Sequence, residues 1–276
     1  MRIEITTDAT EFRSRAEAFL LRDPLRHTVI ATVIANRIAG LDVTEVPEFV
    51  SVHQRDDAVV GAAMRAADRG VYLGELPVES VPAVAGTLAD AEPYTGSVEG
   101  AYEAATTFAE RWCALVGGRY RQTYATRLYR LGVLRIPDVA GSPRVATESD
   151  VGLCVDWLDA MSEESGISGL RVGERGIRAR VASGRWWLWE HRGCPTSLVA
   201  HQLPMHGWSR IGPVYTPPDE RGHGYASALS AHVAHRLRAD GLDVCLFADT
   251  ANRTSNKIYQ AIGFHPTHEF VHHEFS

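Results

Sequence analysis

The sequence has few lysines, no apolar run long enough to cross a membrane, and no excess of positive charge. Of its 28 Lys and Arg residues only Lys257 is a lysine, which we interpret as a codon-usage effect without functional meaning. The formal net charge of −6 argues against nucleic-acid binding, because nucleic-acid-binding proteins usually present a basic face. Every apolar run falls short of the roughly 18 residues that a transmembrane helix needs. We therefore expect neither nucleic acid nor membrane among the partners.

Cysteine is also scarce. Cys113, Cys154, Cys194 and Cys245 are far apart, and they form neither a C-x-x-C pair nor a disulfide-like framework. The first residues lack the charged start and apolar core of a signal peptide, so we expect a cytoplasmic protein. The 12 histidines include no H-E-x-x-H motif, and no set of Cys and His has zinc-site spacing, so we predict no metal.

What remains is the composition of a packed globular protein, with 45% hydrophobic and 22% charged residues. A length of 276 residues favours two domains over one. Residues 137–143, Pro-Asp-Val-Ala-Gly-Ser-Pro, are typical of a linker because Pro and Gly interrupt every periodic pattern there. We therefore predict a first domain over 1–136 and a second over 144–276.

The second half alternates strand and helix patterns in the order strand, two helices, three strands, helix, strand, helix, strand. Trp187 and Trp189 are expected to share one packed face of a strand. The predicted helices span 151–161, 174–182, 222–239 and 252–262, and the predicted strands span 144–146, 186–190, 197–201, 210–215, 244–248 and 269–275.

The first half repeats this order in weaker form, although residue identity between the halves is negligible. Its predicted helices span 8–20, 24–39, 78–90 and 102–116, and its predicted strands span 3–6, 49–54, 58–64, 71–76 and 120–131. Such alternation predicts an α/β fold with a mixed sheet. We interpret the repeat as a degenerate internal duplication.

The most informative segment is 211–226, where a strand ends and a glycine-containing loop opens a helix. Gly222 and Gly224 let the backbone approach a ligand closely. The first turn of the following helix presents unpaired N–H groups and the positive end of its dipole, which suits a pyrophosphate. Because proline cannot donate to a sheet ladder, Gly212-Pro213 predicts that the preceding strand is at an edge, bulged or splayed.

A second polar pattern follows about 35 residues later. On a helix with 3.6 residues per turn, four polar side chains fall within an arc of roughly 100°, next to an apolar face suited to packing on a sheet. The four are Asn252, Ser255, Asn256 and Tyr259. One side of this helix is thus expected to be core, and another to gather polar groups with a phenol at its end.

Together the two patterns resemble the GNAT superfamily of acetyltransferases. Residues 221–226, Arg-Gly-His-Gly-Tyr-Ala, fit its R/Q-x-x-G-x-G/A signature, and residues 252–264 are similar to its N-x-x-S-N-x-x-Y hallmark followed by G-F. The resemblance is tight over 209–265 and looser back to 144, and over 1–136 it rests on element order. It implies the GNAT fold in two tandem copies, acetyl-CoA as co-substrate, and a degenerate N-terminal half.

The resemblance also implies roles for individual residues. Tyr259 would be the general acid that protonates the departing thiolate, and its ordinary pKa near 10 keeps it protonated at neutral pH. Backbone groups at 214 and 215 would hold the pantetheine arm, and the loop amides would bind the pyrophosphate. The implied cofactor-binding residues are Val214, Tyr215, Thr216, Arg221, Gly222, His223, Gly224, Tyr225, Ala226, Asn252, Ser255 and Asn256.

The implied activity is N-acetyl transfer, in which an amine attacks the thioester directly. The amine must first lose a proton to a base, and Glu190, His201, His206 and the carboxylate of Ser276 all remain open. The acceptor stays undefined, from a small-molecule amine to a peptide. Two alternatives also stay open: a catalytically silent acyl-CoA-binding regulatory or scaffold protein, and an acyltransferase with a hydroxyl or thiol acceptor.

The counterpart of the binding loop in the first half is 74–82. It has no glycine pair ahead of its helix, and Glu75 and Glu79 would repel a phosphate. We therefore predict one CoA site per chain. The N-terminal half is expected to shape the acceptor cleft or to form a dimer contact.

Overall fold

The computed structural model of the chain describes residues 1–41, 46–66, 70–165 and 173–276. The chain forms two compact units, each with its own core. Unit 1 comprises Met1–Leu128, Asp249–Ala251 and Thr267–Ser276, and unit 2 comprises Tyr129–Ala248 and Asn252–Pro266. Residues 267–276 were expected in the second domain, and the structure places them in the first unit.

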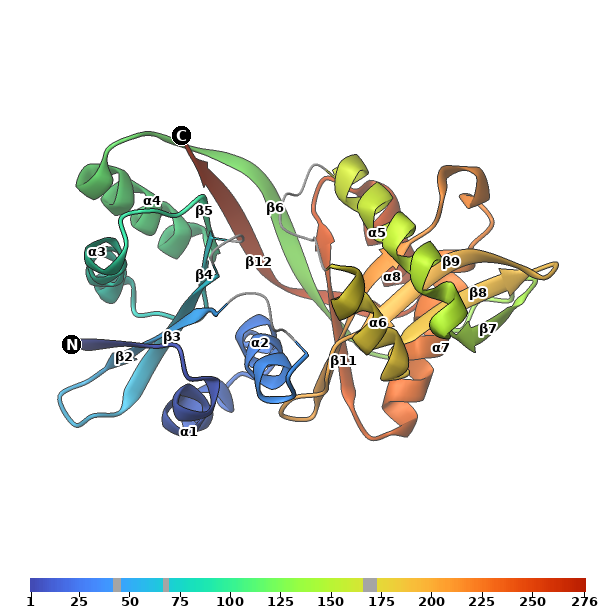
Figure 1. Cartoon of the computed structure of the whole chain (residues 1–276), viewed down its shortest axis with the longest axis horizontal. Helices are drawn as coiled ribbons and strands as arrows, with labels where there is room; N and C mark the ends of the chain where they lie inside the picture. The colour runs from blue at the N-terminus through green and yellow to red at the C-terminus, as the bar shows by residue number, and fades with distance from the viewer. Residues whose placement is uncertain (42–45, 67–69, 166–172) are drawn as a thin grey trace. The chain divides into compact units, whose positions relative to one another are not determined.

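Unit 1 is a mixed sheet with helices on both faces (Figure 1). Its strand order is β1-β2-β3-β4-β5-β12-β6. The pairs from β1 to β4 and the pair β5–β12 are antiparallel, and the pair β4–β5 is parallel. Its helices are α1 (Ala9–Leu20), α2 (Thr28–Ile38), α3 (Val81–Ala91) and α4 (Tyr102–Val116). Its strands are β1 (Arg2–Thr6), β2 (Glu48–His53), β3 (Val59–Ala66), β4 (Gly70–Leu73), β5 (Ser97–Gly100), and the larger parts of β6 (Tyr120–Leu131) and β12 (Phe264–Phe275).

Alternation along the strands of unit 1 sends side chains to two different layers. Val50 and Val52 of β2 join a core with α3 and α4 that includes Phe108 and Trp112. Phe49 points to the opposite face, where its ring stacks on Phe12 of α1 at a centroid distance of 4.9 Å. The strand period of two and the helix period of 3.6 therefore both appear as predicted.

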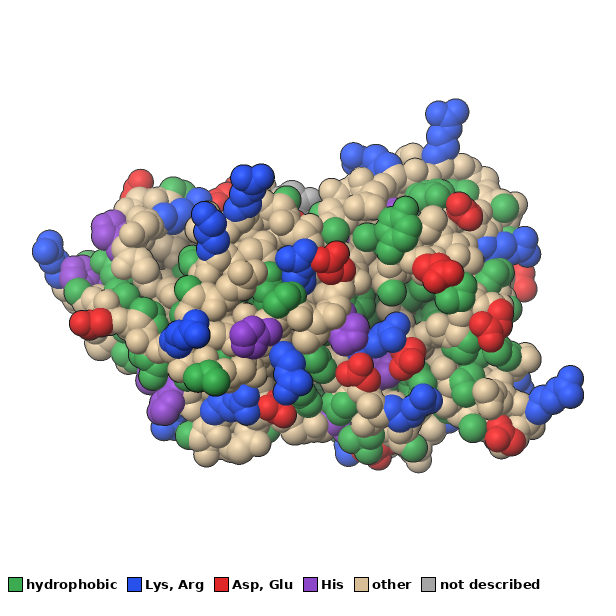
Figure 2. Space-filling model, turned by 180° about the vertical axis from the view of Figure 1, so that it is seen from behind, with side chains coloured by type: hydrophobic (Ala, Val, Ile, Leu, Met, Phe, Trp, Pro, Cys, Tyr) green, Lys and Arg blue, Asp and Glu red, His purple; other side chains and the backbone are tan. Residues whose placement is uncertain are grey.

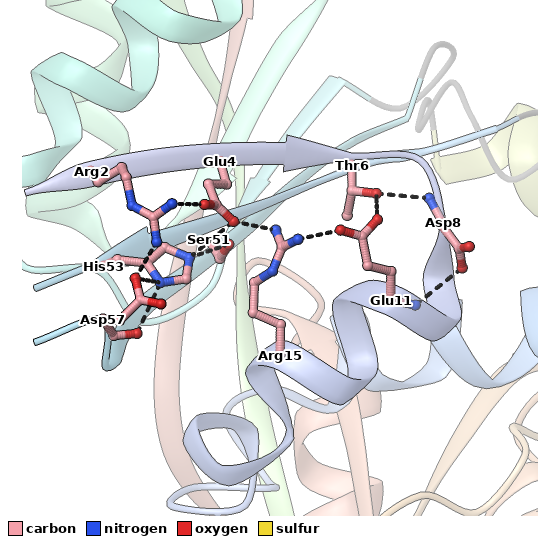
Figure 3. Close-up of polar contacts among 9 residues, drawn as sticks. All are labelled: Arg2, Glu4, Thr6, Asp8, Glu11, Arg15, Ser51, His53 and Asp57. Carbon is pink, nitrogen blue, oxygen red and sulfur yellow. Dashed lines mark hydrogen bonds and ion pairs between the residues drawn. The ribbon is translucent and has the colours of Figure 1, made fainter.

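Charged side chains tie the first strand of unit 1 to its neighbours (Figure 3). Arg15 of α1 reaches Oε2 of Glu4 on β1 at 2.7 Å and also pairs with Glu11. The buried His53 of β2 lies with its Nε2 2.9 Å from the hydroxyl of Ser51 and 3.6 Å from Glu4. These contacts hold α1 and β2 on either side of Glu4, so the strand at the start of the chain is anchored by side chains as well as by its ladder.

Unit 2 has the same kind of architecture. Its helices are α5 (Val151–Ser165), α6 (Glu174–Ala182), α7 (Tyr225–Ala239) and α8 (Arg253–Ala261). Its strands are β7 (Ser142–Val145), β8 (Trp186–His191), β9 (Cys194–His201), β10 (Trp208–Tyr215) and β11 (Asp243–Asp249), with the short remaining parts of β6 and β12. The pairs from β7 to β10 are antiparallel, and β10–β11 is parallel.

The sheet of unit 2 is also covered on both faces, and Figure 1 shows α5 and α6 in front of its strands. The core with α7 contains Leu229, Trp189 and Ile211, and Trp187 packs against it, so the two tryptophans share a face as predicted. The core with α5 and α6 contains Trp186 on the alternate side of β8. These two cores lie on opposite faces of the sheet, and the candidate site lies at the carboxyl end of β10.

The two halves of the chain have the same element order, as the sequence predicted, although β5, which completes the order of the first half, lies outside the predicted strands. The spatial units, however, exchange strands at their ends. Val271 to Glu274 of β12 pair with Gly100 to Ser97 of β5 inside unit 1. Tyr129 and Leu131, at the end of β6, are buried in the core of unit 2. Each unit is therefore completed by a strand that includes residues from the other half of the sequence.

Figure 2 shows the chemical character of one face of the molecule. Basic, acidic and apolar side chains are interspersed across this face. In the described part of the chain, no helix is both long enough and apolar enough to cross a membrane.

Candidate active site

A cavity of about 400 Å³ opens in unit 2 at the end of β10. Five segments line it: the last turn of α5, the end of β10, the following loop, the first turn of α7, and α8. The lining residues are Met161, Glu164, Ser165, Val214, Tyr215, Thr216, Glu220, Arg221, Gly222, Gly224, Tyr225, Ala226, Ser227, Asn252, Thr254, Ser255, Ile258 and Tyr259.

The cavity begins where β10 leaves its parallel neighbour. The register of β10 with β11 runs from Trp208 opposite Asp243 to Ile211 opposite Leu246, while β10 itself continues to Tyr215. Its pairing with β9 shifts register between Ile211 and Val214, across the cis Gly212–Pro213 peptide. The predicted irregularity at Gly212-Pro213 is confirmed: the strand is bulged there, and beyond it Val214 and Tyr215 line the cavity.

The loop after β10 forms a backbone cradle. Gly222 and Gly224 have φ angles of +84° and +82°, a conformation that L side chains rarely adopt. Gly224 is the N-cap of α7, and no side chain caps this helix end. The first-turn amides of α7 are therefore available to an anion, and the helix dipole adds a partial positive charge at the same place.

Helix α8 lines the cavity with its polar side. Asn252 is its N-cap and accepts a 3.0 Å hydrogen bond from the amide of Ser255. Tyr259 lies two turns further on and is 7% exposed. Burial disfavours the phenolate and raises the pKa of Tyr259 to about 12, so this side chain carries its proton throughout the neutral range.

The cavity gathers Tyr259 and ten of the twelve predicted cofactor-binding residues, and the other two lie outside its lining. The exposed His223 stacks its ring on Tyr225 at 5.4 Å. Asn256 is buried, and its side chain bonds to Tyr129 and to the backbone of Asn252. The structure thus gives Asn256 a supporting contact within unit 2.

Glu164 is the lining residue whose partners sequence reasoning missed. It lies in the last turn of α5, more than 50 positions from the loop that it contacts. Its Oε1 accepts a 2.7 Å bond from the hydroxyl of Tyr215, and its Oε2 accepts a 2.5 Å bond from Arg221. These two donors lower the pKa of Glu164, Arg221 more strongly than Tyr215. No local motif announces such a residue.

None of the four candidate bases is among the described residues that line the cavity. Glu190 pairs with Arg144 at 2.8 Å, and Ser276 lies in unit 1. His201 is largely buried, and burial lowers its pKa to about 4. Its ring at neutral pH is therefore uncharged.

Metal ligation finds no support in the described ranges, where no group of three or more His, Cys, Asp or Glu side chains is placed to hold an ion. The corresponding loop in unit 1 also differs from the cradle. The amide of Glu75 lies 3.4 Å from Nε2 of the buried His27, and Pro82 removes an amide from the start of α3. That unit 1 binds no CoA stays a prediction.

Comparison with known proteins shows which fold the chain shares with them. Residues 191–272 match the model of the family described as FR47-like protein. No curated protein matches the sequence. Among solved structures, a GNAT-family acetyltransferase from Colwellia psychrerythraea aligns over 100% of both chains, with a TM-score of 0.62 and 12% identity.

Two further structures agree. A GCN5-related N-acetyltransferase from Sphaerobacter thermophilus is 21% identical with a TM-score of 0.56, over 82% of this chain and 80% of its own. A tandem GNAT protein from the clavulanic acid biosynthesis pathway is 11% identical with a TM-score of 0.56, over 99% of this chain and 98% of its own. The resemblance drawn from the sequence is confirmed: the chain has the α/β fold of GNAT acetyltransferases in a tandem arrangement.

Proposed function

We propose that the chain is an acetyl-CoA-dependent N-acetyltransferase with a small-molecule or peptide amine as acceptor. One observation carries the proposal. A single cavity is lined by the backbone cradle at Gly222 and Gly224, by the end of β10 (Val214 and Tyr215), and by the phenol of Tyr259. An anion cradle alone would suit many nucleotides, whereas a cradle joined to a bulged strand and a buried proton donor suits a thioester.

The residues present suit two chemical parts of coenzyme A, its diphosphate and the amides of its pantetheine arm. Gly222 has open space where a Cβ would stand, and Gly224 would bring a Cβ to 3.2 Å from Cγ2 of Val139. The diphosphate would lie against the amides from Arg221 to Ala226. The register of β10 with β11 ends at Ile211, so the edge of Val214 and Tyr215 that faces β11 is open to the amides of a pantetheine arm, while their other edge pairs with β9.

The proposed reaction is direct attack of a neutral amine on the thioester carbonyl. The C–N bond forms, the C–S bond breaks, the nitrogen loses one proton to water, and the sulfur takes up a proton. Tyr259 would donate that proton. A phenol with a pKa of about 12 is a weak acid toward a thiolate, whose conjugate acid has a pKa near 8.5 in water. Burial in the same cavity also raises the pKa of the thiol, which narrows the difference.

The buried Tyr259 favours turnover over the silent acyl-CoA-binding alternative, because a scaffold protein has no use for a proton donor in the cavity. Acceptors with a hydroxyl or thiol would use the same donor site. An alkylammonium acceptor, with a pKa near 10, must be deprotonated first. The groups described around the cavity include two carboxylates, Glu164 and Glu220, and the first of them is already paired.

The direct test pairs calorimetry with an activity assay. We expect coenzyme A to bind with one site per chain, and acetyl-CoA to be consumed in the presence of at least one member of a broad panel of primary amines. Binding without turnover on any amine, alcohol or thiol would support the silent alternative. Absence of binding to wild-type protein would overturn the proposal altogether.

A further inference from the structure

Glu164 and Arg221, which both line the cavity of unit 2, form an ion pair. Nη2 of Arg221 lies 2.5 Å from Oε2 of Glu164. The same guanidinium donates from Nε to the carbonyl of Thr216 at 2.9 Å and lies over the ring of Tyr215 at 5.8 Å. Three contacts thus hold the side chain of Arg221 in the loop that precedes α7. One of them is with a carboxylate from a helix that is distant in the sequence.

This carboxylate occupies a particular electrostatic position. The cradle at Gly222 and Gly224 suits an anion, and Arg221 is the cationic side chain among the described residues that line its cavity. A bound diphosphate would bring at least two negative charges close to that guanidinium. Glu164 already neutralises this guanidinium, so the carboxylate and the diphosphate compete for the same positive charge.

The pair is exposed enough to be displaced. The side chains of Arg221 and Glu164 are 48% and 41% exposed. Ion pairs of this kind contribute little to stability, because water screens them and both long side chains lose freedom. Tyr215 would keep its own 2.7 Å bond to Glu164 after Arg221 has left, so the carboxylate has an alternative partner.

We propose that Glu164 is an internal stand-in for the diphosphate of the donor, which holds Arg221 until coenzyme A displaces it. The inference rests on the proposed function, since it needs coenzyme A in the cradle. It makes Glu164 a positioning residue that acts through Arg221. Its removal should therefore strengthen donor binding, the reverse of what loss of a ligand contact does.

The test measures the Kd of coenzyme A by calorimetry in the full-length protein. We expect Glu164→Gln to lower the Kd by about fivefold, which is the upper end for a partly exposed ion pair. Glu220→Gln removes another carboxylate from the same cavity and is the matched control, with an expected change below about twofold. Glu163→Gln removes the exposed neighbouring charge on α5 and should likewise change little.

A double variant separates competition from simple repulsion. If Glu164 acts through Arg221, Glu164→Gln should have no effect on the Kd in an Arg221→Gln background. An equal gain in both backgrounds would mean direct repulsion and would overturn the inference. So would an unchanged or higher Kd for Glu164→Gln in otherwise wild-type protein that binds coenzyme A. If wild-type protein does not bind, the proposed function fails instead.

Discussion

The phenolic oxygen of Tyr129 donates a hydrogen bond of 2.5 Å to Oδ1 of Asn256. Tyr129 is fully buried near the end of β6, and Asn256 lies in the middle of α8. Nδ2 of Asn256 donates to the carbonyl of Asn252 at 2.7 Å. This chain of contacts fixes the helix that carries Tyr259 to the strand beneath it. One residue of the GNAT hallmark therefore supports the cavity from outside.

The hydrogen bond between Tyr129 and Asn256 should contribute measurably to the free energy of unfolding. Asn256→Leu keeps the volume but leaves the Tyr129 hydroxyl without its acceptor, so we expect a loss of about 1–3 kcal/mol in the free energy of unfolding. Urea titration followed by circular dichroism measures it. Adding Tyr129→Phe to Asn256→Leu removes the hydroxyl that has lost its acceptor, so the double variant should recover part of the lost stability. Strictly additive losses would contradict the assigned pairing.

Removing the phenolic hydroxyl of Tyr259 should act on the chemical step. We expect Tyr259→Phe to lower kcat by about 10²-fold while changing the Kd of coenzyme A by less than about threefold. Because the pKa of Tyr259 is about 12, its ionisation should not reduce wild-type activity below about pH 10. Steady-state kinetics over a range of pH, on the first amine found to react, checks both. Undiminished turnover in Tyr259→Phe would remove the proposed role.

Replacing Gly224 tests the role of the glycine cradle, and replacing Gly152 in α5 serves as the control. Gly224→Ala places a Cβ at φ +82° and near Val139, so we expect a stability loss of about 1–2 kcal/mol. We also expect coenzyme A binding to weaken by about tenfold, equivalent to about 1.4 kcal/mol.

Gly152 in α5 has open space around its Cβ position, and Gly152→Ala should instead stabilise by about 0.5–1 kcal/mol. Calorimetry and thermal unfolding distinguish the two. A Gly224→Ala protein with unchanged affinity would show that the cradle does not hold the diphosphate.

Lowering the pH should reduce the stability of unit 2, because Asp150 becomes protonated. This carboxylate accepts bonds from Arg144 at 2.7 Å and from the amide of Thr147 at 2.7 Å. Arg144 is the main cause that lowers the pKa of Asp150 to about 2, and burial opposes it. The folded pKa lies below the unfolded one, so the stabilisation is present above about pH 4 and is lost as the pH falls toward about 2.

We therefore expect Asp150→Asn to cost about 2 kcal/mol at pH 7. The difference from wild type should shrink below about pH 4. Urea titrations at several pH values measure it, and a difference that is independent of pH would contradict the linkage.

Much of the local structure could be read from the sequence. Pro213 predicted the irregularity of β10, and the Gly222–Gly224 pair predicted a loop whose backbone a ligand can approach closely. Both are local properties, because ring closure and the absence of a Cβ act on the backbone of the residue itself. The helices and strands could be predicted for a similar reason, because apolar residues recur about every 3.6 residues on one face of a helix and every second residue on one face of a strand.

The partners across space could not be read in this way. Glu164 meets Arg221, and Tyr129 meets Asn256, over separations of 57 and 127 residues. The pairing of β12 with β5 inside unit 1 was also not foreseen. Two halves with one element order offer equivalent last strands, and hydrophobic alternation does not say which sheet each strand joins.

The sequence by itself determined most of the elements, the glycine loop of the cradle, and Tyr259 with ten further residues that line the cavity. The tertiary structure decided which distant carboxylate faces the cradle, which strand completes each unit, and which hallmark residue turns away from the cavity. The division has a physical basis. Backbone conformation is set within a few residues, whereas contacts between side chains of separate elements depend on how those elements pack.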